Sequence, residues 1–212
     1  MSRPTKHHPE RGDARTRLLE AARDVIRAQG FAATSIDDLC RAAGVTKGAF
    51  FHHFESKEAL GVTAARFWAE TTAAFFAGAP YHDHDDPLER VLAYVDFRKA
   101  IIEGDPAEFT CLVGTMTQEA YGSSPAIREA CAASIFGHAA TLEPDIRAAM
   151  RARRIKADWS AASLAAHTQA VLQGAFILAK ATGDREIARD SVDHLRRYVG
   201  FLFSNTSQGK TP

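Results

Sequence analysis

The sequence predicts an all-α protein of about nine helices. Every strongly patterned segment places its apolar residues at helical spacing, and no run of β-branched residues alternates with polar ones as a half-buried strand would. The chain has 212 residues, of which 46% are hydrophobic and 25% charged. This composition supports one or two domains with a core and excludes a disordered chain. Its 26 basic and 26 acidic residues balance, so the net charge does not indicate a nucleic acid or an anionic membrane as partner.

The first three expected helices are short and closely spaced. We expect them over residues 13–29, 34–43 and 46–53. Gly30 is a typical C-terminal stop for the first helix. Thr34 and Asp37 form a start resembling a capping box for the second. Gly44 ends the second helix, and Thr46 caps the third helix.

The remaining helices are expected to be longer. Ser56 opens a long helix, and further helices are expected over residues 86–104, 108–121, 160–182 and 185–203. Another helix begins at Ser124-Pro125, and Pro144 should kink or break it. The chain then divides into a flexible basic arm (1–12), an N-terminal helical unit (13–60), a larger helical domain (61–203) and a loose tail (204–212).

Two short helices joined by residues 43–46, with a supporting helix in front, have the proportions of a helix-turn-helix. The residues spaced to pack inward are Leu19, Ala22, Ile26, Ile36, Leu39, Val45, Phe50 and Phe54. The residues left outward on the third helix are Lys47, Gly48, Phe51 and His52. Such a unit places its second short helix in the major groove of DNA. Basic residues from Arg3 to Arg17, Arg15 among them, either reach nearby DNA or form a solvated arm.

The segment from Thr16 to Leu60, TRLLEAARDVIRAQGFAATSIDDLCRAAGVTKGAFFHHFESKEAL, resembles the DNA-binding domain of TetR-type transcriptional repressors. The resemblance implies that Lys47 reads a base edge, as a lysine can at guanine. It implies phosphate contacts from Ser35, Thr46, His53 and Lys57. The complete set of expected DNA-binding residues is Ser35, Thr46, Lys47, Gly48, Phe51, His52, His53 and Lys57.

Phe51 departs from the family pattern. The family usually has a tyrosine at this position, whose hydroxyl binds a phosphate. We expect His52 or His53 to take over this contact. Cys40, which stands where the family usually has a small alanine, is most simply a packing substitution.

The helix expected over residues 160–182 has an unusually wide apolar arc of roughly 220°, where a single buried face needs about 100°. Two buried faces follow, and the second would lie against a symmetry mate. The alternative is one thick core within a monomer. The expected dimerisation residues on this helix and the last one are Leu164, Val171, Ala175, Leu178, Leu195, Val199 and Leu202.

The middle of the chain combines large aromatic residues with scattered polar ones, as a small-molecule site requires. Core packing is the alternative for each aromatic residue. Because TetR-type repressors bind an effector in this region, the resemblance implies an effector pocket within residues 61–203. Its expected residues are Phe67, Trp68, Tyr94, Phe97, Cys111, Thr115, Glu119, His138, His167 and Phe176.

Cys111 has two interpretations. Residues 110–131 resemble a branch of the family that includes electrophile-sensing repressors, although Thr110 replaces a glycine of that branch. A thiol in the first turn of a helix is a candidate for modification. The alternative is an inert buried cysteine. Three widely spaced cysteines favour a reducing compartment over a disulfide framework.

Other function classes are weaker. Residues 82–86, HDHDD, resemble half of a metallohydrolase signature, but the final histidine is absent, so we expect no metal, cofactor or catalysis. Residues 159–179 lack charges but contain six polar side chains, which argues against a membrane span. The basic run from Arg151 to Lys156 is either a second nucleic-acid surface or a solvated helix end. The start of the chain lacks the apolar stretch of a secretory signal. We therefore expect a cytoplasmic, homodimeric repressor that a small molecule releases from a palindromic operator.

Overall fold

The computed structural model describes residues 13–204 and is helical throughout, without a strand in this range. The predicted basic arm (1–12) and all but the first residue of the predicted tail lie outside the described residues. The helices are α1 (Ala14–Gln29), α2 (Ile36–Ala43), α3 (Lys47–His53), α4 (Lys57–Ala77), a 3₁₀ helix η1 (Pro80–Asp83), α5 (Pro87–Ala100), α6 (Pro106–Phe109), α7 (Leu112–Ala120), α8 (Pro125–Ala152), α9 (Ala161–Thr182) and α10 (Arg185–Ser204). The all-α prediction is confirmed.

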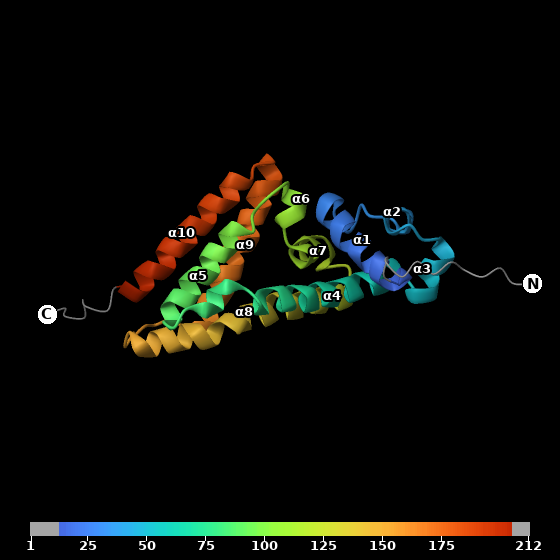
Figure 1. Ribbon diagram of the computed structural model, residues 1–212. Coiled ribbons are helices and arrows are strands. Elements are labelled where there is room, and N and C mark those ends of the chain that lie inside the picture. The colour runs from blue at the N-terminus through green and yellow to red at the C-terminus, as the bar shows by residue number, and fades with distance from the viewer. Residues whose placement is uncertain (1–12, 205–212) are drawn as a thin grey trace, which may run out of the picture.

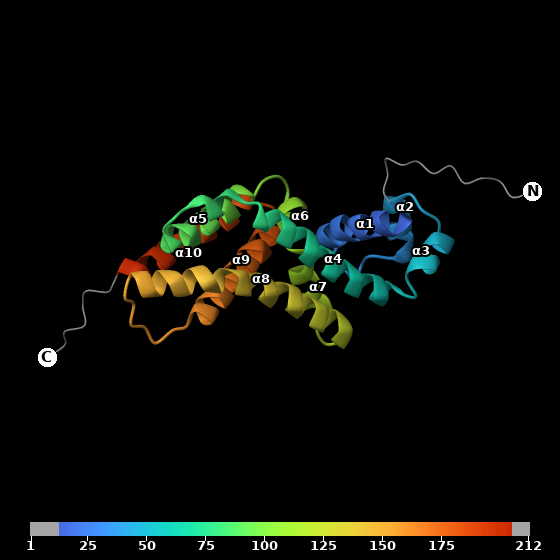
Figure 2. The ribbon, with the colours of Figure 1, turned by 60° about the horizontal axis from the view of Figure 1, so that its bottom comes forward.

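The molecule is elongated, with α1, α2 and α3 at one end and α5, α9 and α10 at the other (Figure 1). Helix α4 runs from the N-terminal end toward the middle and lies beside α8, while α6 and α7 lie against α1 on its side toward α9. Turning the molecule shows α5 and α10 side by side and leaves α3 at the extremity (Figure 2). This arrangement presents α3 to a partner without obstruction from the larger domain.

The structure contains two cores, but they do not coincide with the two predicted helical domains. The first lies beneath α1–α3 and the start of α4, and it also contains Leu112 and Met116 of α7 and Ile127 of α8. The second joins α5, α8, α9 and α10. The boundary predicted at residue 60 falls inside α4. The N-terminal unit is therefore packed onto the larger domain.

Local capping explains most helix ends, with one correction to the predicted pattern. Ser35, not Thr34, caps α2, and its reciprocal partner is Asp38 rather than Asp37. The Thr34 hydroxyl is buried and donates instead to the carbonyl of Gly30 at 2.6 Å. Both threonine and serine have an aspartate three residues later, so the sequence pattern fits either register.

Two further expectations about the helices need correction, and one of the two alternatives for Pro144 is excluded. Pro144 does not break α8, which continues through it with Leu142 and Ile146 buried on either side. The helix expected over 108–121 is two helices, α6 and α7, separated by an extended Thr110. Helix α5 ends at Ala100, four residues before the predicted stop. The sequence analysis did not anticipate η1.

Candidate nucleic-acid interface and ligand cavity

The turn between α2 and α3 has the geometry of a helix-turn-helix. Gly44 adopts a left-handed conformation with φ of 62°, and its backbone N–H closes α2 on the carbonyls of Cys40 and Arg41. Thr46 then caps α3 by accepting from the backbone N–H of Ala49 at 3.1 Å. Arg17 of α1 supports the turn by donating to the carbonyls of Ala43 and Gly44. Arg15 and Arg17, which were candidates for a basic arm, lie in α1. Arg17 contacts the turn between α2 and α3 within the protein.

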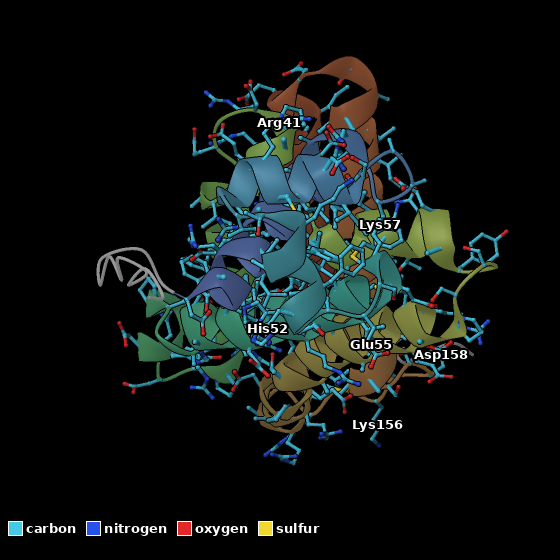
Figure 3. The ribbon with its side chains drawn as sticks, turned by 90° about the vertical axis from the view of Figure 1, so that its right-hand side faces the viewer. Arg41, His52, Glu55, Lys57, Lys156 and Asp158 are labelled. Carbon is cyan, nitrogen blue, oxygen red and sulfur yellow. The ribbon has the colours of Figure 1, made fainter. Side chains whose placement is uncertain are left out.

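Helix α3 separates its residues between the core and the outside. Phe50 of α3 is buried against α1, and so is Phe54, which directly follows the helix; the spacing predicts both. Lys47, Gly48 and His52 are exposed, and Phe51 exposes 54% of its surface. Figure 3 looks directly at this end of the molecule, with His52 on α3 and Arg41 on α2 labelled. An exposed, polar helix face at the extremity of the molecule is what entry into a major groove requires.

Lys47 is paired in the free protein. Its ammonium lies 2.8 Å from an Asp37 carboxylate oxygen of α2, and both side chains are more than half exposed. The hydrogen bond with Asp37 raises the pKa of Lys47. Since exposed pairs of this kind contribute little to stability, Lys47 can exchange Asp37 for a base edge at small cost.

Ser35 and Thr46 stand at the two helix N-termini that face this end of the molecule. Ser35 exchanges hydrogen bonds with Asp38, whereas the Thr46 hydroxyl accepts one bond and retains its own proton for another acceptor. His53 is half-buried beside His52, with ring centroids 4.9 Å apart. Of the predicted DNA-binding residues, Lys47, Gly48, Phe51, His52 and His53 thus lie on α3, Thr46 caps α3 and Ser35 caps α2.

Lys57 differs from the expectation of a phosphate contact. Its ammonium donates to the carbonyl oxygens of Phe31 at 2.9 Å, Ala32 at 3.3 Å and Thr34 at 2.9 Å. It also lies 4.6 Å from the centre of the Phe31 ring. All three ammonium protons are directed at the loop between α1 and α2. In this structure Lys57 organises that loop rather than offering a free donor to DNA.

A large cavity opens between the two ends of the molecule. Its volume is about 730 Å³, and its lining comes from α1, α4, α5, α6, α7, α8 and α9. Four of the predicted effector residues line it, namely Trp68, Cys111, His138 and Phe176. A smaller cavity of about 280 Å³ adjoins it and is lined by Thr115 and Glu119, together with Cys111 and Phe176.

A hydrogen-bonded polar group lies in the wall of the large cavity. The Tyr94 hydroxyl is 2.9 Å from Nε2 of His138 and accepts from the Gln169 amide at 3.2 Å. Burial, reinforced by the nearby Arg98 charge, lowers the pKa of His138 to about 4. His138 is therefore neutral at pH 7, and this wall offers orienting hydrogen bonds without a charge of its own.

Four predicted effector residues lie outside the linings of both cavities. Tyr94 is buried and reaches the large cavity only through its hydrogen bonds with His138 and Gln169. Phe67 packs against the N-terminal core. Phe97 packs among aromatic rings, 5.5 Å from Phe75 between ring centroids. His167 is exposed on α9 and stacks on Tyr198 of α10. The prediction also missed Arg27 and Arg98, because basic residues in the last turn of a helix are usually solvated.

Cys111 occupies the position at which the two cavities meet. It caps α7 rather than lying in its first turn, and its sulfur accepts from the Gly114 N–H at 3.4 Å. It is half-buried, whereas Cys40 and Cys131 are buried. Burial raises the pKa of the Cys131 thiol to about 11. Cys111 is thus the one of the three thiols that a cavity ligand would meet.

The predicted dimerisation residues divide between two faces. Leu164, Ala175, Leu195 and Val199 are buried in the chain's own core, so they are not available to a partner. Val171 and Leu202 are half-buried, and Leu178 exposes 51% of its surface. The exposed apolar residues of α9 and α10 are Ile177, Leu178, Tyr198 and Phe201. The wide apolar arc did indicate two faces, but four of the seven named residues belong to the inner one.

The weaker alternatives find no support in the described part of the chain. Asp86 caps α5 and pairs with Arg153, and no group of three His, Cys, Asp or Glu side chains among residues 13–204 could hold a metal ion. The basic run at the end of α8 lies at the opposite end of the molecule from α3 (Figure 1). Helix α9 has the length and hydropathy to cross a membrane, but it packs between α8 and α10, and Thr168 and Gln169 within it are buried in the protein.

Comparisons with known proteins agree with this geometry. Curated relatives include the transcriptional regulator UidR of Escherichia coli (strain K12), 44% identical over 46 residues, which are 22% of this chain and 24% of UidR. They also include the transcriptional repressor DhaR of Mycobacterium sp. (strain GP1), 29% identical over 118 residues, which are 56% of this chain and 58% of DhaR. The matches thus span about a quarter of UidR and just over half of DhaR.

Solved structures match over nearly the whole described chain. A TetR transcriptional regulator from Chloroflexus aurantiacus has a TM-score of 0.75 and 26% identity, covering 88% of this chain and 94% of that one. A TetR-family regulator from Agrobacterium tumefaciens has a TM-score of 0.76 and 20% identity, covering 87% and 96%. The family model for bacterial regulatory proteins of the tetR family matches residues 18–61, and the model for the tetracyclin repressor-like C-terminal domain matches residues 87–195, more than half of the chain. The chain therefore belongs to the TetR family of transcriptional regulators.

Proposed function

We propose that this protein is a cytoplasmic repressor that binds a palindromic operator as a homodimer and releases it when a small molecule occupies the cavity. The observation that carries the proposal is the exposed face of α3, with Lys47 at its N-terminus, at the extremity of the molecule. DhaR is named a repressor, which supports this direction of regulation.

The proposed homodimer follows from the small number of base pairs that a single α3 can contact. A single recognition helix contacts only a few base pairs, so adequate affinity needs two copies about one helical turn apart. The exposed apolar face of α9 and α10, which includes Ile177, Leu178 and Phe201, supplies a surface for the twofold contact. It lies away from α3, so pairing leaves both recognition helices free (Figure 1).

The release step follows from what borders the cavities. Arg27 of α1 lines the large cavity, so a ligand there touches the helix that supports α3. Glu119 of α7 lines the small cavity and accepts from the backbone N–H of Ala32 at 2.6 Å, in the loop between α1 and α2. A ligand that shifts either contact changes the orientation of the N-terminal unit.

Selection from random DNA duplexes at low salt tests the DNA-binding part of the proposal. We expect a palindrome with half-sites about ten base pairs apart, or a multiple of that spacing. The variant Lys47→Ala is the control that should lose sequence preference. A protein that binds no duplex at low salt contradicts the proposal.

Sedimentation of the purified protein tests the dimer. We expect a dimer for the wild type and a monomer for Ile177→Asp, because the substitution places a charge on the apolar α9 face. Tyr121, equally apolar and 63% exposed at the end of α7, gives the matched control, and Tyr121→Ser should remain dimeric. A monomeric wild type would overturn this part of the proposal.

A further inference from the structure

Two arginines of the large cavity lack a carboxylate partner. Arg27 of α1 is only 8% exposed, and the Nε atoms of Arg27 and of Arg98 on α5 are buried without a hydrogen-bond partner. Neither forms an ion pair among the described residues. Arg23, which lines the same cavity one turn before Arg27, is in contrast bound by both Asp24 oxygens, at 2.6 and 2.9 Å.

The acidic groups of the cavity are already engaged. Asp24 is held by Arg23. Glu108 is exposed and accepts from the backbone N–H of Asp105 at 2.7 Å, where it completes the cap of α6. Arg27 and Arg98 therefore have no carboxylate within ion-pair distance among the described residues, although Asp24 and Glu108 act on Arg27 from farther away. Burial lowers the pKa of Arg27.

Arginines are seldom buried unless they are paired, because desolvation of the charge is unfavourable. The guanidinium of Arg27 lies 5.4 Å from the Trp68 ring centre, and that of Arg98 lies 5.2 Å from the Phe76 ring centre. These contacts offset part of the cost, but an aromatic face supplies no hydrogen-bond acceptor in the plane of the guanidinium. Arg27 lines the cavity without a carboxylate partner, and a carboxylate bound there would match its guanidinium in charge and in geometry.

Much of the remaining lining is apolar. It includes Phe75, Phe109, Val113 and Ile135, beside uncharged polar side chains such as Thr72. A volume of about 730 Å³ far exceeds what a carboxylate alone would fill. The cavity therefore favours a ligand with one anionic end and a substantial hydrocarbon body, and it disfavours cations.

We propose that the cavity binds an amphipathic organic acid, whose carboxylate is held by Arg27 and whose apolar body lies among the aromatic side chains. Arg98 adds a second positive charge to the lining, and its Nη1 already lies 3.5 Å from Nε2 of His138. The regulatory meaning of this site rests on the proposed function. Because Arg27 belongs to α1, the anion would be bound directly by the unit that carries α3.

Matched pairs of acids and amides test the ligand class. Octanoate, 4-phenylbutanoate and naphthalene-2-acetate are each compared with their primary amides by thermal melting and calorimetry of the full chain at low salt. We expect at least one acid to bind ten times more tightly than its amide. If no acid binds more tightly than its amide, the proposal is wrong.

Two variants locate the charge. Arg27→Met keeps the hydrocarbon stem of the side chain. In this variant, the acid that the wild type prefers should bind within about twofold of its amide. Arg27→Gln is a second variant, which keeps a polar side chain, and the same result is expected for it. Arg23→Gln, on the same helix and cavity wall, should keep the preference for the acid. Acid binding by Arg27→Met equal to that of the wild type would overturn the assignment.

The experiment separates this inference from the proposed function. Acid binding is measured without DNA, so a wild type that fails to bind any duplex contradicts the repressor assignment and leaves the ligand class standing. Operator binding with no preference for any acid contradicts the ligand class alone.

Discussion

Lys57 allows a quantitative test of how the N-terminal unit is held together. Replacing it with methionine keeps the length of the side chain and removes an ammonium that donates to three carbonyls of the loop between α1 and α2. A hydrogen bond to a charged group contributes about 1.5–3 kcal/mol when it is buried. Lys57 is only half-buried, and the Phe31 carbonyl retains a bond from the Thr34 N–H at 3.3 Å. We therefore expect Lys57→Met to lower the free energy of unfolding by about 2 kcal/mol in total.

Urea unfolding measures this loss, and the melting temperature should fall by about 4–8 °C for a chain of this length. The salt dependence of operator binding provides the second readout. A lost phosphate contact would reduce the slope of log affinity against log salt by about 0.9 for each copy. We expect an unchanged slope, because the Lys57 ammonium is already occupied within the protein.

The control for Lys57 is Lys156→Met. Lys156 is exposed after the end of α8, and Figure 3 labels both lysines. This variant should change neither stability nor the salt slope. A reduced slope for Lys57→Met with unchanged stability would refute the structural role and restore the phosphate contact that the resemblance implied.

Three further substitutions test the interface and its support. Lys47→Ala should weaken operator binding by about 1–3 kcal/mol and relax the preference for one base pair, measured with single-base operator variants; equal losses on all sequences would contradict base contact. Phe51→Tyr should strengthen operator binding in the same assay, because it restores a hydroxyl at an exposed position; unchanged affinity would show that the hydroxyl is dispensable. Gly30→Ala should destabilise the N-terminal unit in urea, since Gly30 has φ of 89° and an added Cβ would collide with the Glu119 carboxylate. Gly183→Ala is a comparison without a steric contact, because Gly183 also has a positive φ but has open space around it. Since ψ is 159° at Gly30 and 10° at Gly183, the difference between the two variants reports the backbone strain at Gly30 together with the contact with Glu119.

The N-terminal helices could be predicted from the sequence because their boundaries are set locally. Gly44 and Thr46 fix the turn and the start of α3 whatever surrounds them. The error at the start of α2 was also local, since Thr34 and Ser35 each precede an aspartate by three residues. Only the tertiary position of Thr34, buried beneath the loop, decides between them.

The cavity could be predicted only as a region. Phe67 and Trp68 are neighbours in α4 and equally aromatic, yet only Trp68 lines the cavity. The expected dimerisation face was likewise predictable only as a region. Leu164 and Leu178 belong to the same apolar arc of α9, yet Leu164 is 3% exposed and Leu178 is 51% exposed. Periodicity reports that a helix has apolar faces, whereas the packing of α8 and α10 decides which face is inward.

The loop from Gly30 to Thr34 is where the two halves of the proposed function meet. It is held from α4 by the Lys57 ammonium and from α7 by the Glu119 carboxylate, and it begins three residues after Arg27. The coupling free energy between an effector and an operator is typically about 1–3 kcal/mol, which is also the contribution of about one charge-assisted hydrogen bond. A ligand therefore need not unfold or rotate a whole domain. Under the proposed function, some conformations of the protein fit the operator and others do not. A ligand that binds one of these conformations more tightly than the other can change their balance by exchanging a single contact at this loop. Under the proposed function Arg27 and Glu119 would carry this effect, because each lines a cavity, Arg27 belongs to α1, and Glu119 bonds the backbone of the loop.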